Sequence, residues 1–444
     1  MGAGASAQNN SALTFSSAVV EDEMKKPGDG SDIQLDGAKD EVIRLRKLLK
    51  QQLAKERLGN AAIGSLVGNA SAMPLEWFYN RDHLMKILGD TEPLFFPNPS
   101  CLFFHSDSEE AKANWTKVHT TMGFDPLYGY TVDKAAFPGH YDKTGDLCPS
   151  GEMSFMALKA VASLDPTKPI EDPMALAKLY YDAFKQHKGY KPHSLKHFVM
   201  HYEGTPHPIK EEEGDDEAKI AEKTKAAAEK AELQKTYPNI GADNTMAESN
   251  GKIMPCLTRF GLNDDEEFII NNLATMVRLH YNCDYLKAVK VTRFFARVIL
   301  RIAKEGKSIV EAIEEVAALP ENQEDPENKG SIKFSFDFVK KHLEKSVLES
   351  QDEHGLLMFG KPEKVYISRG CMNPHAFVAT ISICLKCKTM EEALRENILL
   401  NGDCSSRAIA IGAIFGAAEG VPEKLLNKFN LKDEAKTMIA ANLG

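Results

Sequence analysis

The chain has 444 residues, 43% hydrophobic and 8% aromatic, which is enough to bury a core and excludes a wholly disordered protein. It has 54 Lys and Arg residues and 64 Asp and Glu residues, which give a net charge of −10. This charge argues against nucleic-acid binding, which normally needs a concentrated basic face. No apolar run approaches the roughly 18 residues of a transmembrane helix. Eight cysteines and no secretion signal indicate a reducing, cytoplasmic compartment.

The first 39 residues differ in composition from the rest. The opening Met-Gly-Ala-Gly-Ala-Ser fits the N-myristoylation pattern, in which Gly2 accepts the acyl chain after Met1 is removed. The alternative is that a small second residue only permits removal of Met1. The stretch to about residue 37 is rich in Ser, Asn, Gly and Asp, which predicts a disordered tether. One myristoyl chain would give weak, reversible membrane association.

A helix is predicted from Asp40 to Arg57, because apolar residues recur on one face, at Val42, Leu45, Leu49 and Leu53. Packing on the main domain is the favoured interpretation, and docking to a partner or a membrane surface is the alternative. The helix runs directly into a segment with small residues every fourth position, at Gly64, Gly68 and Ala72. This spacing predicts close helix packing, after which Pro74 ends the helix and presents Glu76.

The middle of the chain adds a histidine face and a charged insertion. His193, His197 and His201 fall at i, i+4 and i+8, where a pair could bind Zn²⁺, although a solvated helix face is the favoured interpretation. Residues 205–236 are dominated by Glu, Asp, Lys and Ala and predict a solvated insertion. Further helices are predicted over 269–302 and 308–318. Sustained period-2 alternation is absent, so residues 40–444 are predicted to form one all-α domain, a large orthogonal helix bundle.

Three blocks, in this order along the chain, resemble the ADP-ribosylglycohydrolase superfamily. Residues 68–76 match its Gly-Asp-Ala-x-Gly-x-Pro-x-Glu, with Asn69 in place of Asp and Ala72 in place of the second Gly. Residues 151–158 align with Thr-Asp-Asp-Thr-x-Met-Ala-Leu, and residues 402–406 with Gly-Asp-Thr-Asp-Thr. The sequences of residues 148–152, 241–248 and 403–409 are similar to those of the J1-crystallin and selenoprotein J branch, which includes lens structural proteins.

The resemblance implies an all-helical fold and a site that holds a pair of Mg²⁺ ions and cleaves the glycosidic bond linking ADP-ribose to a protein side chain. Carried over residue by residue, it makes Glu76 the candidate base. It assigns Mg²⁺ ligation to Glu152, Asp403 and Ser406, and substrate binding to Asp243 and Asn244.

Met153, Ser405 and Asn69 replace family carboxylates, so Glu152 and Asp403 bring −2 against the +4 of two ions. The expected cofactor is therefore one weakly bound Mg²⁺ or none. The other interpretation is that the two carboxylates only cap helices or bind water.

Three functions remain open from the sequence. The chain could be a weak or altered Mg²⁺-dependent hydrolase of ADP-ribosyl linkages, or a non-catalytic pseudoenzyme that binds an ADP-ribosyl ligand. It could also use the fold as a structural, crystallin-like or scaffold protein, because fold alone does not imply catalysis. The expected partners are an ADP-ribosyl ligand and, through Gly2, a membrane surface, but not nucleic acid.

Overall fold

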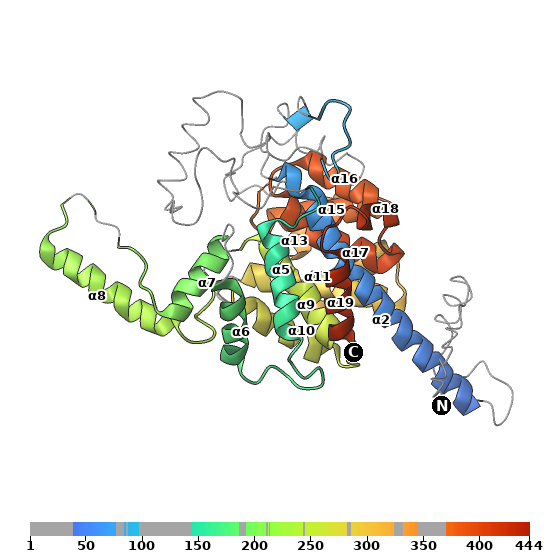
Figure 1. Ribbon diagram of the computed structural model, residues 1–444, viewed down its shortest axis with the longest axis horizontal. Helices are drawn as coiled ribbons and strands as arrows, with labels where there is room; N and C mark the ends of the chain where they lie inside the picture. The colour runs from blue at the N-terminus through green and yellow to red at the C-terminus, as the bar shows by residue number, and fades with distance from the viewer. Residues whose placement is uncertain are drawn as a thin grey trace, which may run out of the picture.

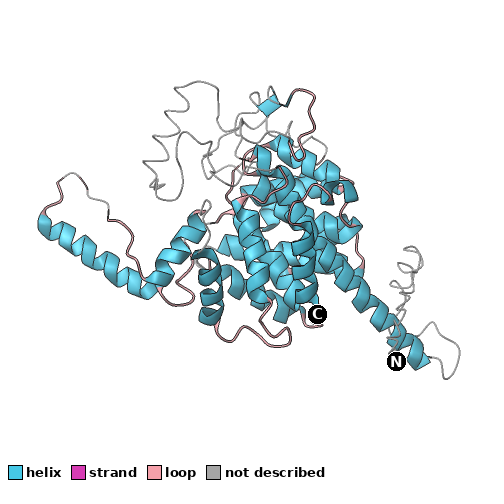
Figure 2. Cartoon of the chain, in the orientation of Figure 1, coloured by secondary structure: helices cyan, strands magenta, loops and turns pink. Residues whose placement is uncertain are grey.

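The structure is a computed structural model that describes residues 39–76, 84–85, 88–96, 144–185, 192–209, 212, 214–242, 245–281, 286–323, 332–341, 343 and 370–444. Within these ranges every regular element is a helix, and pairing between extended segments is limited to isolated bridges (Figures 1 and 2). The predicted all-α bundle is confirmed. None of the helices described is long and apolar enough to cross a membrane.

The helices longer than one turn are, in chain order, α2 (Lys39–Ala72), α5 (Pro149–Val161), α6 (Pro173–Lys185), α7 (His193–Glu203), α8 (Glu217–Gln234), α9 (Ile253–Phe260), α10 (Glu266–Arg278), α11 (Leu286–Glu305), α12 (Ile309–Ala317), α13 (Ile332–Lys341), α15 (His375–Lys386), α16 (Met390–Leu400), α17 (Cys404–Glu419) and α19 (Lys432–Leu443). The one-turn helix α18 (Glu423–Leu426) and the 3-10 helices η1 (Met73–Leu75), η4 (Ala247–Lys252) and η5 (Pro320–Asn322) complete the described elements.

The core is organised around the packing of α2 against α17. The two helices approach so closely that a side-chain carbon on Gly64 would strike the carbonyl of Gly412, and one on Gly412 would strike the carbonyl of Gly64. A side-chain carbon on Gly68 would likewise come within 2.5 Å of the carbonyl oxygen of Ala408. The four-residue spacing of small side chains is therefore what allows two backbones to touch. This contact fixes the ends of both helices, and the candidate site lies there.

The two halves of α2 have different surroundings. From Leu58 onward its residues are mostly buried, whereas Leu45 and Leu48 are 50% and 48% exposed. Figure 1 shows the N-terminal half extending away from the bundle. The predicted packing of the first helix on the main domain therefore applies only to its later turns.

The charged insertion also extends from the bundle. Of the 18 residues of α8, only Ala231 is buried, and α8 lies beside α7 at the edge of the molecule (Figure 1). A solvated insertion is what the lack of an apolar face predicted. The N-terminal tail, with Gly2, lies outside the described residues, so its disorder and its acylation stay predictions.

Candidate functional site

Asn69, near the end of α2, links the starts of two other helices. Its amide nitrogen donates to the hydroxyl of Ser150 (3.1 Å) and to the carbonyl of Ser405 (3.2 Å). Its amide oxygen accepts from the backbone N–H of Cys148 (3.0 Å). A carboxylate could not donate those two hydrogen bonds. Asn69 is thus a structural link suited to an amide, and Gly151 leaves room for it, because a side-chain carbon there would overlap the amide oxygen.

Glu76 follows η1 and is 5% exposed. Its Oε2 accepts a hydrogen bond (2.6 Å) from the backbone N–H of Ser405, which lies in the first turn of α17. The thiol of Cys404 lies 3.4 Å from the same oxygen. A carboxylate at this position satisfies a free N–H of the helix and interacts favourably with its dipole. Glu76 therefore takes over the capping of α17.

Asp403 immediately precedes α17, yet its side chain does not cap the helix. It is 2% exposed, its Oδ1 accepts from the hydroxyl of Ser406 (2.9 Å), and its Oδ2 is buried without a hydrogen-bond partner. Helix capping, one interpretation offered for this carboxylate, is therefore wrong for Asp403. Burial, and then the adjacent Asp403 carboxylate, raise the pKa of Glu76 well above its usual range. The pair needs a proton or a cation between its members.

A third buried carboxylate, Glu248 in η4, adds to this charge. Its Oε2 accepts from the hydroxyl of Ser194 (2.7 Å). Burial raises the pKa of Glu248 to about 7, and Asp403 contributes to the rise. Burial also lowers the pKa of Lys252 to about 7, where its ammonium lies 4.6 Å from the centre of the Tyr180 ring. No role was predicted for Glu248 or Lys252 from the sequence, because only the packing of η4 against α17 and α5 brings them here.

The chain at the start of η4 is hydrogen-bonded to residues 371–373. The N–H of Ala247 donates to the carbonyl of Cys371 (2.7 Å), and the N–H of Asn373 donates to the carbonyl of Thr245 (2.8 Å). Burial, together with Asp403, raises the pKa of the Cys371 thiol, which places this segment near the carboxylates. Both polar atoms of the Asn373 side chain are buried without a hydrogen-bond partner.

Further side-chain atoms of α5 and η4 are also buried without a hydrogen-bond partner: Ser154 Oγ, Ser249 Oγ, Asn250 Oδ1 and Lys252 Nζ. Buried polar atoms are normally satisfied by protein, water, an ion or a ligand. Because η4 and α5 pack against each other and against α17, water, an ion or a ligand at this junction would satisfy these atoms.

The structure brings some of the predicted site residues together, and others lie outside the residues that it describes. Glu76, Asp403 and Ser406 lie together, as described. Glu152 is partly buried in the first turn of α5, a helix that packs against both η4 and α17. Asp243 and Asn244 lie outside the described residues, so their role in substrate binding stays a prediction.

The donor set fits one hard divalent ion. Such ions prefer carboxylate, hydroxyl and water oxygens, and Asp403, Glu76 and Ser406 supply them, with Oδ2 of Asp403 open. The additional carboxylates with which the family holds a second ion are replaced in this chain. Met153 is buried in the hydrophobic core. The hydroxyl of Ser405 is 2.8 Å from the thiol of Cys148.

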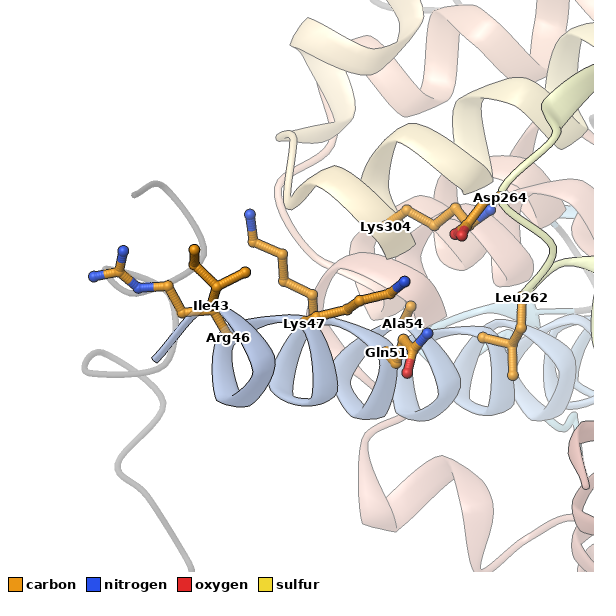
Figure 3. Close-up of a pocket in the computed structure, with 9 residues that line it drawn as sticks. Ile43, Arg46, Lys47, Gln51, Ala54, Leu262, Asp264 and Lys304 are labelled. Carbon is orange, nitrogen blue, oxygen red and sulfur yellow. The ribbon is translucent and has the colours of Figure 1, made fainter. Parts of the chain in front are cut away.

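A separate hollow of about 440 Å³ lies beside the exposed half of α2 (Figure 3). Lys47 and Lys50 line it, together with Lys304, Asp264 and Leu262. Its lining contains none of the carboxylates described above, so it is distinct from the candidate site.

The ADP-ribosylglycohydrolase family model matches residues 50–443. A solved structure described as an "ADP-ribosylglycohydrolase-related protein complex" aligns over 88% of this chain and 98% of that chain, with 12% identity and a TM-score of 0.49. No curated protein sequence matches the chain. The family model covers all three motif blocks and every helix of the bundle apart from the first turns of α2. The chain belongs to the ADP-ribosylglycohydrolase family.

Proposed function

We propose that this chain binds an ADP-ribosyl ligand at the junction of η1, η4 and α17, with one weakly held Mg²⁺, and hydrolyses ADP-ribosyl linkages slowly or not at all. The observation that carries the proposal is the pair of adjacent carboxyl groups of Asp403 and Glu76, both almost fully buried. Two adjacent buried carboxylates repel each other, and a divalent ion would relieve that repulsion.

Asp403, Glu76 and the hydroxyl of Ser406 are the groups that would hold the ion, and Glu152 is the additional carboxylate that the family motif suggests. When bound, Mg²⁺ would polarise substrate oxygen atoms or the attacking water as a Lewis acid. Burial and the neighbouring Asp403 carboxylate raise the pKa of Glu76 well above its usual range, which suits Glu76 to hold a proton at the site. Its hydrogen bond from the N–H of Ser405 keeps that carboxylate oriented.

Slow turnover follows from the charge available. Family enzymes balance two Mg²⁺ with paired carboxylates, whereas Met153 here belongs to the core and Ser405 contacts Cys148. With one ion at most, the site keeps part of the charge stabilisation that such a reaction needs and loses the rest.

A purely structural role, as in crystallins, explains the site less well. Buried carboxylates and unpartnered polar atoms destabilise a folded protein, and apolar replacements are often as stable or more so. A scaffold could use Glu76 to cap α17 but has no need of two further buried carboxylates, Asp403 and Glu248, beside it. A binding function gives that arrangement a purpose.

Calorimetry with ADP-ribose, with and without Mg²⁺, tests the proposal. We expect binding by the wild type that Mg²⁺ strengthens, loss of the Mg²⁺ effect in Asp403→Asn, and no change in the control Glu229→Gln on the exposed surface of α8. Turnover of ADP-ribosyl-arginine and ADP-ribosyl-serine should be slow or undetectable. The absence of any ADP-ribose binding would favour the structural role, and turnover at ordinary enzyme rates would refute the loss of activity.

A further inference from the structure

Three histidines meet at the end of α7, away from the carboxylates. Nitrogen atoms of His197, His201 and His207 all lie within 4.8 Å of one another. The Nε2 atoms of His201 and His207 are 2.8 Å apart, and the rings of His197 and His207 have centroids 4.6 Å apart. His201 is 1% exposed, whereas the other two are half-buried, so one side of the cluster remains open to water.

The end of the helix explains how His207 reaches the other two. Gly204 adopts the left-handed conformation (φ +68°), and the N–H of Thr205 donates to the carbonyl of Met200 (2.8 Å). This is a tight helix ending that reverses the chain. His207 then follows between Pro206 and Pro208, whose rings restrict the backbone. The cluster thus has two ligands on one helix face and a third on a restrained turn.

The buried ring is also held in the form that a metal requires. Nδ1 of His201 lies 2.9 Å from the carbonyl of Ile240, which can only accept a hydrogen bond. Nδ1 must therefore carry the proton, and in the neutral ring Nε2 presents a lone pair toward His207. A backbone carbonyl that orients a histidine in this way is the usual outer partner of a metal ligand.

We propose that His197, His201 and His207 bind one divalent transition-metal ion of the Zn²⁺ class, with water completing the coordination. Imidazole nitrogen suits Zn²⁺ and its neighbours, whereas Mg²⁺ prefers oxygen. Zn–N bonds of about 2.0–2.1 Å in a tetrahedral site put the nitrogens roughly 3.3 Å apart, within the spread observed here. His201 and His207 would need to separate only slightly.

The surroundings favour neutral rings. Burial lowers the pKa of both His201 and His207, and the positive charge of Lys230 lowers both further. Neutral imidazole is the form that coordinates a metal. A bound ion would fix the end of α7 to the turn that leads toward α8. Its effect would therefore be local to the base of the arm that α7 and α8 form at the edge of the molecule (Figure 1).

The sequence pointed to His193 as the third member of this group, and the geometry points to His207 instead. The side chain of His193 lies outside what the structure describes, and its position is one turn earlier on α7. A comparison of variants at these two positions therefore distinguishes the helix-face triad from the proposed cluster.

The test is a titration of Zn²⁺ into the full-length protein against a chromophoric indicator, in excess Mg²⁺ to occupy the oxygen site. We expect one tightly bound Zn²⁺ per chain, with affinity reduced more than about tenfold in His207→Gln and in His197→Gln, since even the loss of an outer-shell partner has effects of that size. His193→Gln should bind as the wild type does. Both replaced residues are partly exposed, and thermal melting without metal checks that each variant folds.

Two further readouts do not depend on affinity. Zn²⁺ should raise the melting temperature of the wild type but not that of His207→Gln, and Co²⁺ in its place should give the absorption of a tetrahedral nitrogen site. The proposal is overturned if the wild type binds Zn²⁺ no more tightly than the double variant His197→Gln/His207→Gln. It is also overturned if His193→Gln loses binding while His207→Gln keeps it.

Discussion

The junction of α2 and α17 and the base of the α7–α8 arm each gather potential metal ligands, but by different means. At the junction, oxygen donors lie at the ends of helices whose backbones touch through Gly64 and Gly412. At the arm, nitrogen donors lie on one helix and on the turn that follows it, beside α8, which has a single buried residue. The junction depends on contacts distant in sequence, and the arm on local ones. Changes at the junction should therefore affect the whole fold, and changes at the arm only its own surroundings.

Gly412→Ala should have the largest effect. Its methyl group would meet the backbone carbonyl of Gly64, which cannot move without separating the two helices. We expect a loss of more than about 3 kcal/mol in the free energy of unfolding, measured by urea denaturation. The matched control is Gly59→Ala on α2, where the new carbon would lie 3.6 Å from a Leu443 side-chain atom. That change should be neutral or stabilise by about 0.5–1 kcal/mol. Similar losses at both positions would contradict the close backbone contact.

Glu248→Gln should change how stability depends on pH. The pKa of Glu248 is about 7 in the folded protein against a usual 4.5, so between these values the folded state holds a proton that the unfolded state has released. The stability of the metal-free wild type should therefore fall as the pH rises from 4.5 to 7, by up to about 3 kcal/mol. The amide keeps an acceptor for Ser194 and should make this slope shallower, leaving the part that the raised pKa of Glu76 contributes. Lys252, with its pKa lowered to about 7, acts mainly above that pH. Parallel pH profiles for the two proteins would refute the assignment.

Asn69→Asp restores the family's residue, yet we expect it to destabilise the protein by about 2 kcal/mol. A carboxylate cannot donate to the carbonyl of Ser405, which would be left buried and facing a negative charge. Asn271→Asp is the control, because Asn271 is exposed and uses only its amide oxygen, toward Arg293. Denaturant titrations of both variants give the comparison. Greater stability in Asn69→Asp would show that position 69 is a lost ligand instead of a link.

Asp216→Ala should have the smallest effect. Asp216 caps α8 by accepting from the N–H of Lys219 (2.9 Å), and removing such a cap costs about 1 kcal/mol. Since α8 contributes so little to the core, we expect faster hydrogen exchange in its first turn and an unchanged melting temperature of the bundle. A lower melting temperature of the bundle would mean that the arm is coupled to the core.

The sequence predicted the features that depend on local pattern. Helical periodicity predicted the all-α fold, and the small residues at positions 64, 68 and 72 predicted close packing, because both signals are carried by neighbours along the chain. The family resemblance placed Glu76 and Asp403 in one cleft, and they are adjacent.

Other features could not be read from the sequence. Glu248 and Lys252 join the site through the packing of η4, which no spacing reveals. Asn69 looked like a lost ligand, because a sequence does not show which carbonyl an amide faces. His207 lies past a glycine that ends the helix, so a search for helical spacing stopped at His201.

The most direct test of the proposed oxygen site is an equilibrium titration of Mg²⁺ into the wild type and into Asp403→Asn, with bound metal counted per chain. Asp403→Asn keeps an acceptor for the hydroxyl of Ser406 and removes the negative charge. We predict one weakly bound Mg²⁺ per wild-type chain and none in the variant. Mg²⁺ binding that is absent from the wild type, or equal in the two proteins, would contradict a metal centre at this junction.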